Sequence, residues 1–159
     1  MRNFIFILLV SLLSATLVFA DAATDRQQTV FIQNWVAAIK NKNPEQIKIL
    51  IHPECLSAIT SVNEDYLNYY INQLIFNGEL KDYKFKLSKT SMPSNQDDYF
   101  DGLVTMPVIP AYNIELKIVS DNNVRLFGSI SSLNGQWYFV IPVPTEKGME
   151  QFRLTVNKQ

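Results

Sequence analysis

The chain has 159 residues, of which 47% are hydrophobic and 18% are charged, and this length suits a single domain. Fourteen basic and fifteen acidic residues give a net charge of −1. That balance provides no electrostatic footprint for nucleic acid and no polybasic cluster for an anionic membrane surface. Five glycines and seven prolines exclude collagen-like and low-complexity classes. The composition therefore predicts a folded domain, but it does not identify a function.

Residues 1–20 have the pattern of a secretory signal peptide: a short positive start, a long uncharged apolar run and a small residue at the end. We expect cleavage after Ala20, with Ala22 or Ala23 as the alternative position. The competing interpretation is an uncleaved membrane anchor, although the run is shorter than the roughly 20 apolar residues of a spanning helix. The mature chain, residues 21–159, is then one exported domain in the periplasm or outside the cell, without a stable membrane span.

Helical periodicity dominates the first half of the chain. Between residues 25 and 41 the apolar residues fall on one helical stripe, namely Phe31, Ile32, Trp35, Val36 and Ile39. A second helix is predicted to start at Asn43-Pro44, with Asn as the cap and Pro in the first turn, and to end around His52. A third is predicted from Ser61 or Asn63 to Gly78.

After Gly78 the hydrophobic period changes from helical spacing to two, which indicates β-strands. We expect about five strands, over residues 82–90, 100–108, 111–120, 124–133 and 136–141. Asn134-Gly135 is the strongest hairpin signal in the chain. The order of elements predicts an α+β fold, with N-terminal helices packed on a curved, cone-shaped antiparallel sheet.

The hairpin turn also predicts which side chains share a face. If Asn134-Gly135 is a two-residue turn, Ile130 faces Phe139, and residues directly opposite each other lie on one face. If the preceding loop pairs Ser120 with Val124, the apolar side chains of strand 111–120 join that face, which the helices must cover. Gly128 lies in the middle of this inner face and indicates a bend or a close approach.

Helices followed by a curved antiparallel sheet and an aromatic last strand resemble the nuclear transport factor 2-like superfamily. The resemblance rests on element order, on the segment Ile51-His52-Pro53-Glu54 and on the final strand, and it covers Thr24 to Thr145. It implies a pocket between the sheet and the helices and frequent dimers through the outer sheet face. It implies no particular activity, because members of the superfamily include enzymes, ligand binders and adaptors.

Candidate pocket residues are aromatic or polar side chains that the predicted faces direct towards such a pocket: Trp35, His52, Tyr66, Tyr70, Tyr112, Ser132 and Trp137. The inner face of the last three strands contains no Asp, Glu or His, so we expect a non-enzymatic binding or accessory domain for a small apolar ligand or an envelope partner. The alternative is a small isomerase or dehydratase that uses an acid or base from a helix or loop. We identify no catalytic residue, no metal site and no cofactor.

His52 and Cys55 lie close together but do not form a recognisable site. A histidine at the end of a helix can bond the last carbonyl groups, and this structural role is the expected one for His52. Cys55, the single cysteine, allows no internal disulfide and is expected to be a small buried hydrophobe, with an intermolecular disulfide as the alternative.

The outer face of the final hairpin carries more apolar groups than a solvated sheet face usually does. Phe127, Tyr138 and Val140 lie there, with Arg125 nearby. Aromatic side chains with Arg are typical of interface cores, so we expect a homodimer or a partner protein at this face. The alternative is that residues 145–159 fold back over it.

Overall fold

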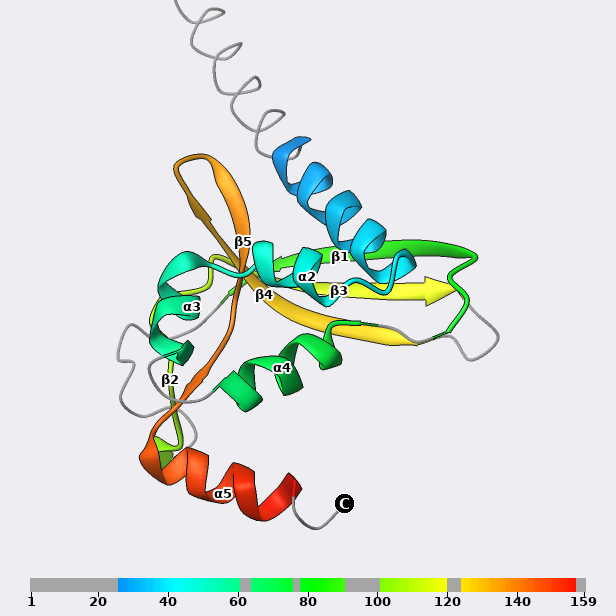
Figure 1. The fold of residues 1–159 in the computed structure, drawn as a ribbon. Coiled ribbons are helices and arrows are strands. Elements are labelled where there is room, and N and C mark those ends of the chain that lie inside the picture. Colours follow the sequence, from blue (N-terminus) through cyan, green and yellow to red (C-terminus); the bar gives the residue numbers. More distant parts are fainter. Residues whose placement is uncertain (1–25, 61–63, 76–77, 91–100, 120–123, 157–159) are drawn as a thin grey trace, which may run out of the picture.

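A computed structural model of the chain describes residues 26–60, 64–75, 78–90, 101–119 and 124–156. The signal peptide predicted for residues 1–20 lies outside these residues. The fold is α+β, with helices in the N-terminal half followed by an antiparallel sheet of four strands and a second sheet of two strands (Figure 1). The larger sheet does not close into a barrel. Within the part of the chain that is described, no helix is long and apolar enough to cross a membrane.

The helices form where the sequence provides apolar stripes and caps. Residues 26–40 are helical (the 26–40 helix), followed by α2 (Pro44–Ile49), α3 (Pro53–Thr60) and α4 (Glu64–Gln73). The predicted cap of α2 is confirmed, because the Asn43 side chain accepts hydrogen bonds from the backbone N–H groups of Glu45 and Gln46 at 3.1 and 3.3 Å.

Helix α3 was not predicted, and it changes the expected role of His52. The carbonyl of His52 accepts from the N–H of Leu56 at 3.0 Å, and its Nδ1 accepts from the N–H of Glu54 at 3.3 Å. His52 therefore caps the start of α3 and does not bond the last carbonyls of the preceding helix. The reason is Pro53, which disfavours helical geometry at His52 but fits the first turn of the helix that it begins.

The larger sheet has the order β1–β3–β4–β5, with neighbouring strands antiparallel. Its strands are β1 (Asp82–Lys89), β3 (Tyr112–Val119), β4 (Arg125–Leu133) and β5 (Gln136–Val140). The predicted hairpin register is confirmed, since Leu133 pairs with Gln136 and Ile130 with Phe139.

The register between β3 and β4 differs by two residues from the expected one. Leu116 pairs with Leu126, whereas a Ser120–Val124 pairing would have placed Ile118 opposite Leu126. Ser120 itself lies outside the described residues. A shift of two residues leaves every side chain on its predicted face, because side chains alternate with a period of two.

The larger sheet has four strands, where about five were expected. The segment predicted as a strand over 100–108 contributes, in its described part, the short β2 (Val104–Thr105), which pairs with β6 (Val143–Pro144) in the second sheet. Pro107 and Pro110 cannot donate backbone hydrogen bonds to a ladder, which keeps this segment out of the larger sheet.

The last described element is helix α5 (Glu146–Val156), which packs on α4. Phe152 makes edge-to-face contacts with Tyr66 and Tyr69, with ring centroids 5.4 and 5.2 Å apart. Figure 1 places α5 at the far end of the molecule from the β4–β5 hairpin and well away from β1 and β3. The described part of the C-terminal segment therefore folds back onto a helix and not, as the alternative had it, over the outer sheet face.

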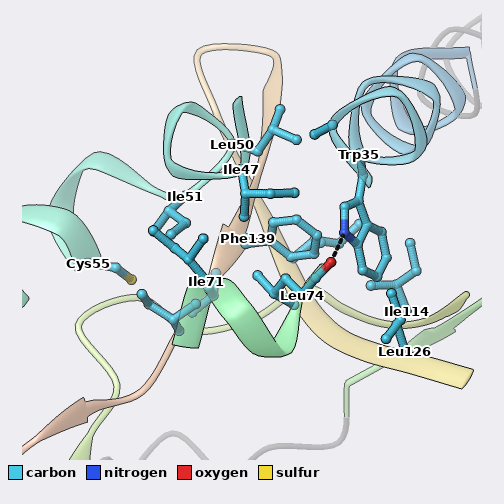
Figure 2. Close-up of a cluster of buried hydrophobic side chains, with 14 of the residues drawn as sticks. Trp35, Ile47, Leu50, Ile51, Cys55, Ile71, Leu74, Ile114, Leu126 and Phe139 are labelled. Carbon is cyan, nitrogen blue, oxygen red and sulfur yellow. Dashed lines mark hydrogen bonds between the residues drawn. The ribbon is translucent and has the colours of Figure 1, made fainter. Parts of the chain in front are cut away.

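The core lies between the inner face of the larger sheet and the helices. Phe139 is at its centre, edge-to-face with Phe31 and Trp35 at centroid distances of 4.9 and 4.7 Å (Figure 2). The Trp35 indole N–H donates to the carbonyl of Leu74 at 3.0 Å, which satisfies its polar group inside the core. Gly128 allows this packing, because a Cβ atom there would lie 2.9 Å from the Phe139 ring. The predicted close approach at Gly128 is therefore present.

Candidate functional site

A surface groove lies between the 26–40 helix and the β4–β5 hairpin, with a volume of about 470 Å³ (the helix–hairpin groove). This volume is within the range of roughly 300–1,000 Å³ that small-molecule sites occupy. The groove is lined by residues of the helix, the end of α2 and the hairpin: Arg26, Gln27, Val30, Phe31, Asn34, Leu50, Gly135, Gln136 and Trp137.

The lining combines an apolar floor with a polar rim. Phe31, Leu50 and Trp137 are buried in the floor, while Val30 is 48% exposed on the helix side. Gln27 and Gln136 can donate and accept hydrogen bonds at the rim. Since an apolar wall with a few polar groups is the usual composition of a ligand site, the groove is suited to a largely apolar molecule.

A smaller hollow of about 230 Å³ lies beside this groove, next to the 26–40 helix. The two hollows share Asn34 and Leu50, and the smaller one adds Ala37, Gln46 and Ile49. Ile49 is 70% exposed, an unusual position for a large aliphatic side chain. The two hollows are therefore neighbours on one side of the 26–40 helix, and the lining of the smaller one is both apolar and polar.

Of the seven predicted pocket residues, the structure brings three together beside the groove. Trp137 lines it, Tyr112 makes an edge-to-face contact with Trp137 at 5.6 Å, and Ser132 is paired directly opposite Trp137. These three share the inner face of the sheet, as the alternation predicted.

The other four lie elsewhere. Trp35 is completely buried in the core, and buried His52 caps α3 with its ring 5.6 Å from that of Tyr138. The Tyr66 hydroxyl on α4 donates to the carbonyl of Pro142, which directly precedes β6, at 3.2 Å. Tyr70 lies beside Tyr66, with ring centroids 6.3 Å apart. None of these four lines the helix–hairpin groove.

Sequence reasoning did not identify the helix side of the groove. Val30 and Ala37 fall outside the core stripe of the 26–40 helix, and apolar residues outside a stripe are a weak sign of a second surface. The turn residues Gly135 and Gln136 line the groove only because the hairpin is folded against the helix. This neighbourhood is tertiary and has no local sequence signal.

Three ionisable side chains near α3 and α4, those of Cys55, Tyr66 and Tyr70, have raised pKa values. Burial raises the pKa of Tyr70 to about 12, and the neighbouring Cys55 adds to this effect. Burial also raises the pKa of Tyr66 and of the Cys55 thiol, although a backbone hydrogen bond from Ile141 opposes the shift at Cys55. A thiol that remains protonated is a poor nucleophile. Across the described residues no cluster of three or more His, Cys, Asp and Glu could hold a metal ion.

The predicted interface residues on the outer face of the sheet differ in their exposure. Phe127 is 64% exposed and Arg125 is exposed beside it, whereas Tyr138 is half-buried and Val140 is buried within the chain. Val140 therefore cannot contribute to an interface of the folded chain, which corrects the expectation of three apolar groups there. The exposed apolar surface of this face reduces mainly to Phe127.

No protein-family model matches the chain, and comparisons with curated proteins and with solved structures found no match. The resemblance to the nuclear transport factor 2-like superfamily therefore stays a prediction from element order.

Proposed function

We propose that this chain is an exported, non-enzymatic binding domain that holds a small, elongated, largely apolar ligand in the helix–hairpin groove. The observation that carries the proposal is the groove itself, with a volume of about 470 Å³, an apolar floor and a second hollow beside it that includes Ile49. Export rests on the signal-peptide pattern of residues 1–20.

The chemistry of the lining favours binding over catalysis. Among the described lining residues the one ionisable side chain is that of Arg26, and proton transfer needs a group that can exchange a proton near neutral pH. Arg26 can instead pair with an anionic head group, while Val30, Leu50 and Trp137 contact the apolar part. A medium-chain fatty acid is therefore a suitable probe of the class of ligand.

The experiment is a titration of the mature protein with a series of saturated fatty acids, followed by tryptophan fluorescence. Trp137 lines the groove and Trp35 lies in the core, so Trp137→Phe should remove the ligand-dependent signal. Each added methylene that enters the groove should tighten binding about fourfold, because a buried CH₂ contributes roughly 0.8 kcal/mol. Decanol should bind more weakly than decanoate if Arg26 pairs with the carboxylate.

Two matched variants test the location of the site. Val30 and Ile109 are both 48% exposed, but only Val30 lines the groove. Val30→Asn, which removes the apolar contact without adding a charge, should weaken decanoate binding by about fivefold, or about 1 kcal/mol, while Ile109→Asn should leave it unchanged. Equal losses of decanoate affinity in the two variants, or an affinity that does not depend on the length of the fatty acid, would contradict the proposal.

A further inference from the structure

Three cations from three strands lie in one row across the outer face of the larger sheet. Lys84 on β1 pairs with Lys117 on β3, and Lys117 pairs with Arg125 on β4. All three side chains are exposed. Neighbouring strands are about 4.8 Å apart, so the three charges are concentrated on a short line across the sheet.

The adjacent row adds a fourth cation and the exposed aromatic ring. Lys86 pairs with Glu115, which pairs with Phe127. Glu115 forms an ion pair with Arg125 at 3.0 Å, so one carboxylate already occupies a position among these cations. We name Lys84, Lys86, Lys117, Arg125 and Phe127 the cationic face.

This arrangement costs stability within the isolated chain. Like charges directly opposite each other on a sheet are destabilising, and Lys117 has a cation opposite it on both sides. Among the described acidic residues, Glu115 and Asp82 are the two on this face, and Asp82 lies at the end of β1. The excess of positive charge is confined to this face, since the whole chain has a net charge of −1.

We propose that the cationic face binds an acidic segment of a partner protein. Carboxylates of the partner would form ion pairs with the cations of the row, as Glu115 already does with Arg125, and Phe127 would provide an apolar contact beside them. Arg and aromatic residues are enriched in protein interfaces, whereas uncovered like charges are not stabilising by themselves. This surface is separate from the helix–hairpin groove, so the two proposals can fail independently.

Other occupants fit the charges less well. A two-fold homodimer through this face would bring the four cations of one copy against those of the other, because a two-fold interface uses the same patch twice. Lipid-binding clusters of 4–8 Lys and Arg residues lie next to a membrane-spanning helix or on an amphipathic helix, whereas these four cations lie on three strands of a sheet. A nucleic acid would meet the same small number of cations on a chain of net negative charge.

The test measures binding of the mature protein to a fluorescein-labelled octaglutamate peptide by fluorescence anisotropy. Lys117→Glu should weaken binding by at least about tenfold, and added salt should weaken binding to the unsubstituted protein. Lys40→Glu, which makes the same charge change at an exposed position on the 26–40 helix, is the matched control and should retain most of the affinity.

A stability measurement separates loss of binding from loss of folding. Lys117→Glu replaces two repulsive cross-strand pairs with attractive ones, so its thermal midpoint should rise while its affinity falls. The proposal is overturned if the peptide does not bind, if Lys40→Glu loses as much affinity as Lys117→Glu, or if phosphatidylglycerol vesicles bind at this face more tightly than the peptide does. Self-association that Lys117→Glu abolishes, in the absence of peptide binding, would overturn it in favour of a homodimer.

Discussion

Substitution of Gly128 by alanine tests the packing of the core most directly. The new Cβ atom would lie 2.9 and 3.1 Å from two carbons of the Phe139 ring and 3.4 Å from a methyl group of Ile114. Non-bonded carbons prefer about 3.5–4.0 Å, so the ring must move by roughly half an ångström or more. The edges of Phe31 and Trp35 hold that ring, with centroids 4.9 and 4.7 Å away.

The expected cost follows from two opposing terms. Overpacking a core typically costs about 1–3 kcal/mol, whereas replacing glycine by alanine within a strand gains roughly 0.5–1 kcal/mol of conformational entropy and packing. We expect Gly128→Ala to lower the free energy of unfolding by about 1–2 kcal/mol. Urea denaturation followed by tryptophan fluorescence measures this, and Ser132→Ala, exposed on the same strand, should stay within about ±0.5 kcal/mol.

A double-mutant cycle identifies the cause. Phe139→Leu is itself destabilising, but it removes the ring carbons that the new methyl group would meet. In that background Gly128→Ala should cost nothing or stabilise the protein, which gives a coupling energy of about 1–3 kcal/mol. The reasoning is refuted if Gly128→Ala lowers the free energy of unfolding as much in the Phe139→Leu background as in the unsubstituted protein, or if it stabilises the unsubstituted protein.

Four further predictions concern other parts of the chain. Asn43→Ala should cost about 1 kcal/mol in urea unfolding because it removes the cap of α2, and Asn43→Asp should retain most of the stability. Gly148→Ala places a Cβ atom against the backbone carbonyl of Leu103, so limited proteolysis should cleave α5 faster in this variant, and an unchanged rate would contradict the close approach. Burial raises the pKa of Tyr70 from about 10 to about 12, so its contribution to stability is complete below pH 10 and is lost as the pH rises to about 12. Tyr70→Phe should therefore lose less stability than the unsubstituted chain over that range, and parallel pH profiles would argue against the shift. Protein isolated from the envelope should begin at Asp21 or within a few residues of it by N-terminal sequencing, and an intact Met1 in membrane fractions would favour the uncleaved anchor.

The sequence by itself determined the fold class, the cap of α2, and the inner and outer faces of the larger sheet. These features depend on short-range rules, because Asn134-Gly135 fixes the register of the last hairpin and a period of two then assigns each side chain to a face. The same rules predicted burial of Phe139 and a close approach at Gly128, both of which the structure confirms.

The tertiary structure decided which residues from distant parts of the chain lie together at the surface. Pro53 predicts the end of one helix from sequence alone, and in the structure it is also the first residue of α3, with His52 as the cap. The helix–hairpin groove exists because the hairpin folds beside the 26–40 helix, about 100 residues away along the chain. Lys84 and Lys117 are about 30 residues apart in sequence and become neighbours only through the register of β1 and β3. A net charge of −1 gives no sign of this row of cations, because composition adds charges over the whole chain, whereas the fold collects them on one face.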